Sequence, residues 1–174
     1  LFPNASKDVV SEDDPKMIPF YYNLRTGIET IKVNSEDSNA SVYYYAFCWA
    51  PDDQHRPLRV DRVYYKADTD DDGKDEDVVI TDYTVCMRDP ATNIAYIAIT
   101  AASDPDDDLY VDAFCWHNPA RPDDPWLYGN EIIKDVLTRL GGYSYDKYFF
   151  NLAAWETEGA KIIEQGMHLS LGID

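Results

Sequence analysis

The sequence predicts an α+β fold that is mainly β: an antiparallel β sandwich or barrel over about residues 17–117, with one or two C-terminal helices packed on it. Three observations predict this fold. Short β-branched or aromatic runs follow one another at hairpin spacing as far as Trp116, with no clear helical period among them. The string Ala46-Phe-Cys-Trp49 recurs as Ala113-Phe-Cys-Trp116. After Pro125 the apolar residues change to helical spacing.

The chain is expected to begin with a flexible acidic segment, residues 1–16, which is polar and aperiodic. Residues 17–174 are expected to form a single α+β domain, because a chain of 174 residues buries one good core rather than two. Since 45% of the residues are hydrophobic and 14% are aromatic, that core can pack well despite the high charge.

The two copies of the repeated string each close a strand-like run, residues 41–49 and 109–116. A unit used twice predicts equivalent strands with equivalent burial, and therefore an internal duplication. Further strands are expected wherever β-branched and aromatic residues cluster between turn residues. They are residues 18–22, 28–33, 58–65, 77–87 and 94–100, with turns at 34–39 and 88–93.

Helical spacing predicts a C-terminal helix over residues 131–140, with Asn130 as its N-cap and Gly141-Gly142 as its end. Residues 145–165 fit either a second helix or strands. The tail, residues 168–173, alternates apolar with polar or small residues and is expected to pair at a sheet edge.

The chain carries a formal net charge of −18, from 33 acidic and 15 basic residues, and 25 of the acidic residues are Asp. Asp favours turns and loops over helices, so much of this charge is expected in the connections between strands. Such a field repels nucleic acid and anionic membranes. It attracts metal cations and basic proteins, and it is also typical of proteins from high-salt surroundings.

Extracellular secretion is the expected location. The chain begins without an initiator Met, as a processed secreted protein does, although a trimmed chain looks the same. Two sequons, at Asn4 and Asn39, predict a glycoprotein. In an oxidising compartment Cys48 and Cys115 could pair and leave Cys86 free, whereas in a reducing one all three would stay buried thiols.

The acidic stretch from residue 68 to 77 predicts a calcium site, because a hard cation binds six or more oxygens and relieves the repulsion between crowded carboxylates. Its start matches the Asp-x-Asp-x-Asp-Gly pattern, with Gly73 at the sharp turn. The stretch resembles the strand-flanked calcium loop of FG-GAP-type repeats, which implies a further ligand at Glu76. The alternative is a solvated hairpin tip, as expected also for the second acidic cluster, residues 104–108. The expected ligands are Asp68, Asp70, Asp72, the backbone carbonyl of Lys74, and Glu76.

Tyrosines and tryptophans gather near the repeated strands, and they predict a carbohydrate-binding surface of aromatic rings. Because neighbouring side chains of a strand face opposite ways, the run Tyr43-Tyr-Tyr45 cannot be buried on one face only. Cross-strand aromatic pairs that stabilise a sheet are the alternative. The expected ligand-binding residues are Tyr43, Tyr45, Trp49, Tyr65, Trp116 and Trp126.

Two short pieces, Arg62-Val-Tyr-Tyr65 and Cys48-Trp49, resemble parts of the blades of fungal fucose-binding propeller lectins. Their order and spacing differ from those of a blade, so the resemblance implies no site residues in this chain.

No coherent catalytic set is visible in the sequence. The three histidines, His55, His117 and His168, are scattered, and no phosphate loop or nucleophile elbow is present. We therefore expect a secreted, acidic, non-enzymatic binding protein, with carbohydrate as the favoured ligand and calcium in support. The first alternative is an inhibitor or immunity protein that neutralises a basic protein partner. The second is a small enzyme that uses paired carboxylates.

Overall fold

The computed structural model divides the chain after His117 into two compact units, Leu1–His117 with Leu171–Asp174, and Asn118–Ser170. The expected flexible segment, residues 1–16, lies outside the described residues, and the single-domain expectation for residues 17–174 stays a prediction. The residues that the structure describes are 18–34, 39–71, 73–105, 108–118, 120, 121, 123, 126–137, 157, 160, 161 and 171–173.

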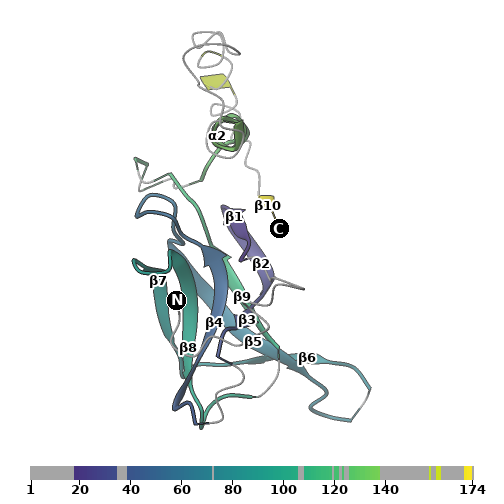
Figure 1. Cartoon of the computed structure of the whole chain (residues 1–174). Helices are drawn as coiled ribbons and strands as arrows, with labels where there is room; N and C mark the ends of the chain where they lie inside the picture. Colours follow the sequence, from purple (N-terminus) through teal and green to yellow (C-terminus); the bar gives the residue numbers. More distant parts are fainter. Residues whose placement is uncertain are drawn as a thin grey trace, which may run out of the picture. The chain divides into compact units, whose positions relative to one another are not determined.

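Two four-stranded antiparallel sheets form the first unit and confirm the mainly β, sandwich-like prediction (Figure 1). Their strands are the β-branched and aromatic runs of the sequence, which suit a half-buried pleated surface. Sheet 1 has the order β2 (Leu24–Glu29), β9 (Leu109–Phe114), β5 (Arg59–Ala67) and β6 (Glu76–Val79). Sheet 2 has the order β3 (Ile31–Lys32), β4 (Val42–Trp49), β8 (Ile94–Thr100) and β7 (Thr84–Asp89).

The core lies on the inner faces of the two sheets. In β8, Ala95, Ile97 and Ile99 are buried while the residues between them are only half-buried. The same alternation buries Leu109 and Val111 in β9. This period of two is what a strand with one face on a core requires.

A short strand at the N-terminal end, β1 (Phe20–Tyr22), touches both sheets. The backbone N–H of Trp49, at the end of β4, donates to the carbonyl of Pro19 at 2.8 Å. The backbone N–H of Trp116, just beyond β9, donates to the carbonyl of Tyr21 at 3.0 Å. The strand β1 also pairs with β10 (Leu171–Ile173), which confirms that the tail of the chain pairs at a sheet edge.

The two repeated strings occupy matching places. The strands β4 and β9 are each second in the order of their sheet, counted from β3 and β2 respectively. The burial of their Phe and Cys residues also matches, while Trp116 is buried and Trp49 is half-buried. Whether this equivalence records a duplication stays a prediction. The buried matching residues are Phe47 with Phe114 and Cys48 with Cys115.

Two of the expected strands are each two strands, which corrects the boundaries drawn from the sequence. The run 28–33 is divided at Thr30 between β2 and β3, and the run 77–87 is divided at residues 80–83 between β6 and β7. At both breaks the chain crosses from sheet 1 to sheet 2. At the first break Ile28 and Val33 on either side are both buried, so the hydrophobic pattern continues through the crossing although the hydrogen-bond ladder does not.

The second unit contains the helix α2 (Gly129–Asp135), which overlaps the expected helix 131–140. The helix begins earlier than expected, because its N-cap is Tyr128 and not Asn130. The carboxylate of Glu131 accepts the backbone N–H of Tyr128 at 2.8 Å and supplies the cap from within the first turn. Among the described residues no helix is both long and apolar enough to span a membrane.

Candidate functional site

An aromatic cluster brings together the two tryptophans of the repeated strings. The ring centroids of Trp49 and Trp116 are 5.8 Å apart. Phe20 of β1 stacks on Trp116 at 4.8 Å and meets Trp49 edge-on at 6.2 Å. Trp116 is fully buried, whereas Trp49 is only half-buried. Trp49 and Trp116, both expected on a ligand-binding surface, are thus in contact, and of the two only Trp49 keeps exposed ring surface.

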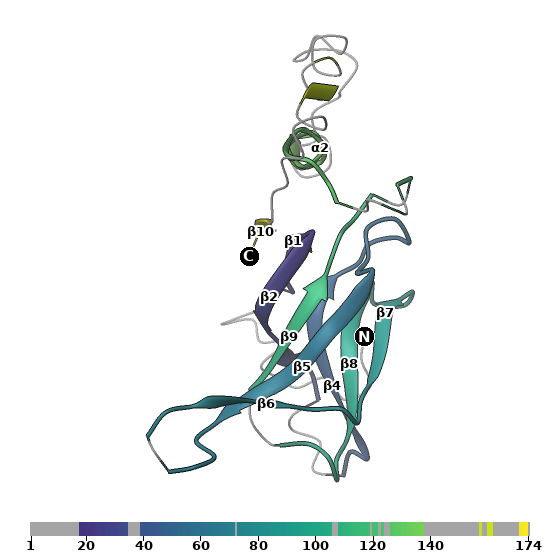
Figure 2. The same ribbon diagram turned by 180° about the vertical axis from the view of Figure 1, so that it is seen from behind.

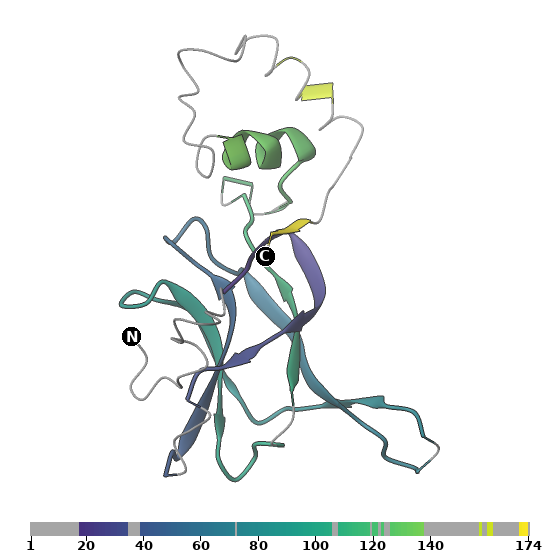
Figure 3. The same ribbon diagram turned by 45° about the vertical axis from the view of Figure 1, so that its right-hand side comes forward.

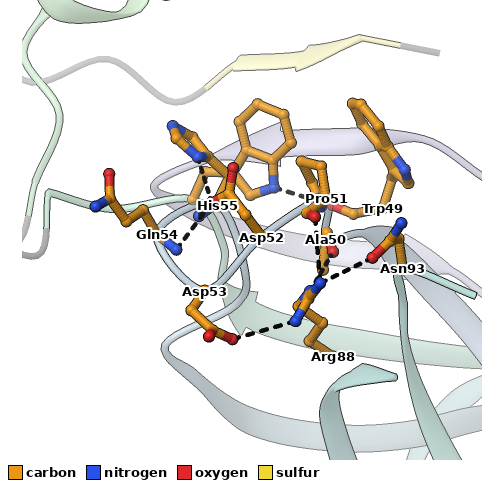
Figure 4. A network of polar contacts seen from close by, with 10 residues as sticks. Trp49, Ala50, Pro51, Asp52, Asp53, Gln54, His55, Arg88 and Asn93 are labelled. Atoms are coloured by element: carbon orange, nitrogen blue, oxygen red, sulfur yellow. Dashed lines mark hydrogen bonds and ion pairs between the residues drawn. The ribbon is translucent and has the colours of Figure 1, made fainter. Parts of the chain in front are cut away.

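A histidine–carboxylate pair lies beside this cluster, in the loop that follows β4. The Nδ1 atom of His55 is 2.7 Å from Oδ1 of Asp52 (Figure 4). The His55 ring meets the Trp116 ring edge-on at 5.2 Å. Burial alone would raise the pKa of Asp52, but the hydrogen bonds from His55, joined by its charge, lower it below its ordinary value.

Arg88 of β7 fixes the same loop (Figure 4). Its guanidinium donates to the carbonyl of Ala50 at 3.2 Å and to the side-chain oxygen of Asn93 at 3.0 Å. It also contacts the carboxylate of Asp53 at 3.4 Å. The loop between Ala50 and His55 is thus held by an edge strand of sheet 2, so its polar side chains are presented in a defined arrangement.

A second histidine, His117, is buried at the same end of the first unit. Its Nδ1 atom is enclosed and has no hydrogen-bond partner. Burial lowers the pKa of His117, and the positive charges of Arg56 and His55 contribute to the lowering. His55 and His117 therefore lie close enough to interact electrostatically, although the sequence showed the histidines only as scattered.

Tyr43 and Tyr45 belong to a different cluster, built around a largely buried ion pair. The ammonium of Lys32 contacts the carboxylate of Asp104 at 2.6 Å, and the side chain of Asp104 is only 4% exposed. The hydroxyl of Tyr45 donates to the same carboxylate. The Lys32 ammonium also lies 4.0 Å from the centroid of the Tyr43 ring. These tyrosines support sheet 2 as cross-strand and cation–π partners.

The remaining two predicted aromatic residues, Tyr65 and Trp126, belong to different units. Tyr65 of β5 is half-buried and pairs in register with Leu109 of β9. Trp126 belongs to the second unit, where its carbonyl accepts a hydrogen bond from Arg121. Arg121 also contacts Glu131 at 2.7 Å and lies over the Tyr128 ring. The six predicted aromatic residues do not form one surface within the first unit.

The acidic stretch forms the tip of the β5–β6 hairpin, between strands as expected. The backbone N–H of Gly73 donates to the carboxylate of Asp68 at 2.9 Å, and the hydroxyl of Thr69 donates to Glu76. Asp71 and Gly73 have φ values of 60° and 81°, so the tip turns through the left-handed region. Within the described part of the chain, no three His, Cys, Asp or Glu side chains are arranged to hold a metal.

Three of the predicted calcium ligands remain to be placed. Asp72 lies outside the described residues, and Asp70 and Lys74 are exposed at the tip. Because one expected ligand cannot be placed, the calcium site stays a prediction.

One polar cluster on the outer face of sheet 1 was not predicted. Asp112 accepts hydrogen bonds from the Gly27 backbone at 2.8 Å and from Arg62 at 3.0 Å, and Arg62 also contacts Asp77 at 3.0 Å. The Arg62 guanidinium lies over Tyr64, 4.0 Å from the ring centroid. Burial and the two carboxylates raise the pKa of Tyr64. The sequence signal was present, because Asp112 interrupts the apolar run of its strand.

Comparison of the chain with protein-family models, with curated proteins and with solved structures gives no match, so its function can be inferred only from its own residues.

Proposed function

We propose that this protein is an acidic binding protein that docks onto basic proteins through the β5–β6 hairpin, as an inhibitor or immunity protein would. The observation that carries the proposal is the shape and charge of that hairpin. In all three ribbon views it extends beyond the rest of sheet 1 (Figures 1, 2 and 3). The exposed acidic residues of its tip and second strand are Asp68, Asp70, Asp71, Asp75, Glu76 and Asp77.

The two basic residues of the hairpin stem are directed away from the tip, where Lys74 stands among the acidic residues. Arg62 is engaged by Asp112 and Asp77 on the outer face of the sheet. Lys66 lies over the ring of Tyr110, 5.1 Å from its centroid. Both cations are thus directed onto the sheet. A projecting carboxylate cluster on a chain of net charge −18 favours fast, salt-sensitive association with a basic partner.

Two variants with the same net charge test where binding occurs. The tip variant carries Asp68→Asn, Asp70→Asn, Asp71→Asn and Asp75→Asn. The control variant carries four exposed or part-exposed changes elsewhere: Asp53→Asn, Asp61→Asn, Asp82→Asn and Asp108→Asn. Binding to immobilised lysozyme and cytochrome c, both basic proteins, is measured with chelator present at low and at physiological salt.

The tip variant is expected to lose at least about tenfold in affinity, and the control variant clearly less, because charge near the contact matters more than distant charge. The wild-type association rate should fall steeply as salt rises. Equal losses in the two variants would show that net charge alone is responsible and would remove the hairpin from the proposal. Absence of binding at low salt would contradict the proposal that this protein binds basic proteins.

Carbohydrate binding at Trp49 is a second candidate, favoured by one specific observation. Trp49 is half-buried, and the loop that follows it carries the exposed or part-exposed polar side chains of Asp52, Asp53 and Gln54. An indole ring with some exposed surface, together with carboxylates and an amide in the next loop, suits a sugar, which stacks through its C–H face and hydrogen-bonds through its hydroxyls. Glycan-array binding that is insensitive to salt and lost in Trp49→Ala would support this candidate.

Secretion and glycosylation are compatible with both candidates and remain proposals. Asn39, the acceptor of the second predicted sequon, is exposed. A mass shift on enzymatic deglycosylation of protein from a secreting host, smaller in Asn39→Gln than in wild type, would support its modification.

A further inference from the structure

Two cysteine thiols meet in the core of the first unit. Cys48 belongs to β4 of sheet 2, and Cys115 directly follows β9 of sheet 1. Both side chains are fully buried, and the two thiol groups lie close enough to interact with each other. The third residue of the repeated string is Cys48 in one copy and Cys115 in the other. These two residues come from different sheets and lie close together in the core.

The neighbouring residues hold these two positions together. The carbonyl of Trp49 accepts a hydrogen bond from the indole Nε1–H of Trp116 at 2.9 Å. The same carbonyl accepts the thiol of Cys48 at 3.3 Å. A cross-sheet hydrogen bond thus lies one residue along the chain from each thiol. The residues that directly follow Cys48 and Cys115 are thereby held together across the two sheets.

The third cysteine is directed elsewhere. Cys86 of β7 pairs in register with Tyr96 of β8, whose side chain lies on the outer face of sheet 2. Burial and a hydrogen bond with Cys86 raise the pKa of Tyr96 to about 12. Cys48 is instead in register with Ala95, which points into the core. Cys86 and Cys48 therefore lie on opposite faces of the sheet.

We propose that Cys48 and Cys115 form a disulfide bond that joins the two sheets, and that Cys86 remains a free thiol. The oxidant is a small disulfide such as oxidised glutathione. One cysteine thiolate attacks it and releases one glutathione thiol, which leaves a mixed disulfide on the protein. The second cysteine thiolate then attacks the protein sulfur and releases the second glutathione thiol. Two protein thiols are oxidised, one external disulfide is reduced, and two protons pass to the released thiols.

The bond is expected to form while the chain folds. The contact with Cys48 and burial together raise the pKa of Cys115 well above its ordinary value in the folded protein. A thiol of that kind is neither nucleophilic nor accessible to a small disulfide. During folding both thiols have ordinary acidity, and the approach of the two sheets brings them together before water and oxidant are excluded.

The test is oxidative refolding of the full chain. The protein is denatured and reduced, then refolded with reduced and oxidised glutathione. It is then unfolded in denaturant without reductant, so that every free thiol, including a buried one, is alkylated with iodoacetamide before the intact mass is measured. Wild type is expected to carry one label, and Cys86→Ala none. Cys48→Ala and Cys115→Ala are each expected to carry two, because either change leaves no partner for the other thiol.

Peptide mapping of the wild type makes the result independent of whether the variants fold. A linked peptide pair that contains Cys48 and Cys115, and that separates on reduction, supports the proposal. Three labels on refolded wild type, or a linked pair that contains Cys86, would overturn it.

Discussion

The indole Nε1–H of Trp116 donates a hydrogen bond of 2.9 Å to the backbone carbonyl of Trp49. The two residues hold the same place in the repeated strings, but their strands belong to different sheets. The backbone N–H groups of both tryptophans donate to the segment that contains β1, at Pro19 and Tyr21. One end of the sandwich is therefore closed by contacts between the two copies and by a strand that both copies bind.

Trp116→Phe is expected to lower the free energy of unfolding by roughly 2–3 kcal/mol, because it removes this hydrogen bond and part of a fully buried ring. Trp49→Phe is the matched control. It makes the same chemical change in a half-buried ring and should cost less than about 1 kcal/mol. Urea unfolding measures both. If the two variants lose equal stability, the buried indole is not what closes this end of the sandwich.

Asp104→Ala should destabilise the first unit by about 2–4 kcal/mol, since it removes the acceptor shared by the Lys32 ammonium and the Tyr45 hydroxyl. The lower part of that range applies if Lys32, which is 19% exposed, can turn to water. The control is Asp61→Ala, which breaks an ion pair with Arg59 at the surface and should cost less than about 1 kcal/mol. A loss of stability no larger than that of the control would exclude a supporting role for the cluster.

Stability should fall as the pH is lowered from about 7.5 to 5. Burial lowers the pKa of His117 in the folded protein below its ordinary value near 6.5. In this pH range His117 binds a proton in the unfolded chain but stays neutral in the folded protein. The unfolded state is therefore increasingly favoured as the pH falls through the pKa that His117 has in the unfolded chain. One such group contributes a slope of at most about 1.4 kcal/mol per pH unit.

His117→Gln tests this dependence, because glutamine keeps a polar side chain and cannot titrate. Urea midpoints at several pH values should change less steeply in the variant than in wild type. A slope that the variant leaves unaltered would assign the pH dependence to other groups.

Much of the strand pattern could be predicted, because alternation of apolar residues depends only on local sequence and one buried face. The crossings at Thr30 and at residues 80–83 could not. At Thr30 the chain leaves β9, where its backbone N–H still donates to Leu109, and joins β4 as β3. No feature of the sequence near Thr30 indicates that the chain changes its neighbouring strand there, because the residues before and after Thr30 pack into the same core.

The candidate site was predicted less well, because burial is decided by the packing of distant segments. The composition near the repeated strings correctly brought Trp49 and Trp116 together, but it could not tell which ring the strand β1 would cover. Tyr45 is 1% exposed because an ion pair between Lys32 and Asp104 packs against it. Those two residues are separated by more than seventy positions in the chain.

Calcium is predicted to raise the melting temperature if the tip of the β5–β6 hairpin binds it. An ion that binds only the folded state stabilises it by about 2.7 kcal/mol at a hundredfold excess over its Kd, which corresponds to several degrees for a chain of this size. Thermal melts in millimolar calcium and in chelator measure the effect. Asp70→Asn with Asp72→Asn should abolish the difference, because the variant loses two of the five expected ligands.

The matched control for this prediction is Asp82→Asn with Asp108→Asn, which removes the same charge from exposed positions outside the tip. Calcium should stabilise this control as much as it stabilises wild type. If calcium raises all three melting temperatures equally, the ion acts by screening the net charge of −18 and has no site at the tip. If it raises none, the tip is a solvated turn whose carboxylates remain available to a basic partner.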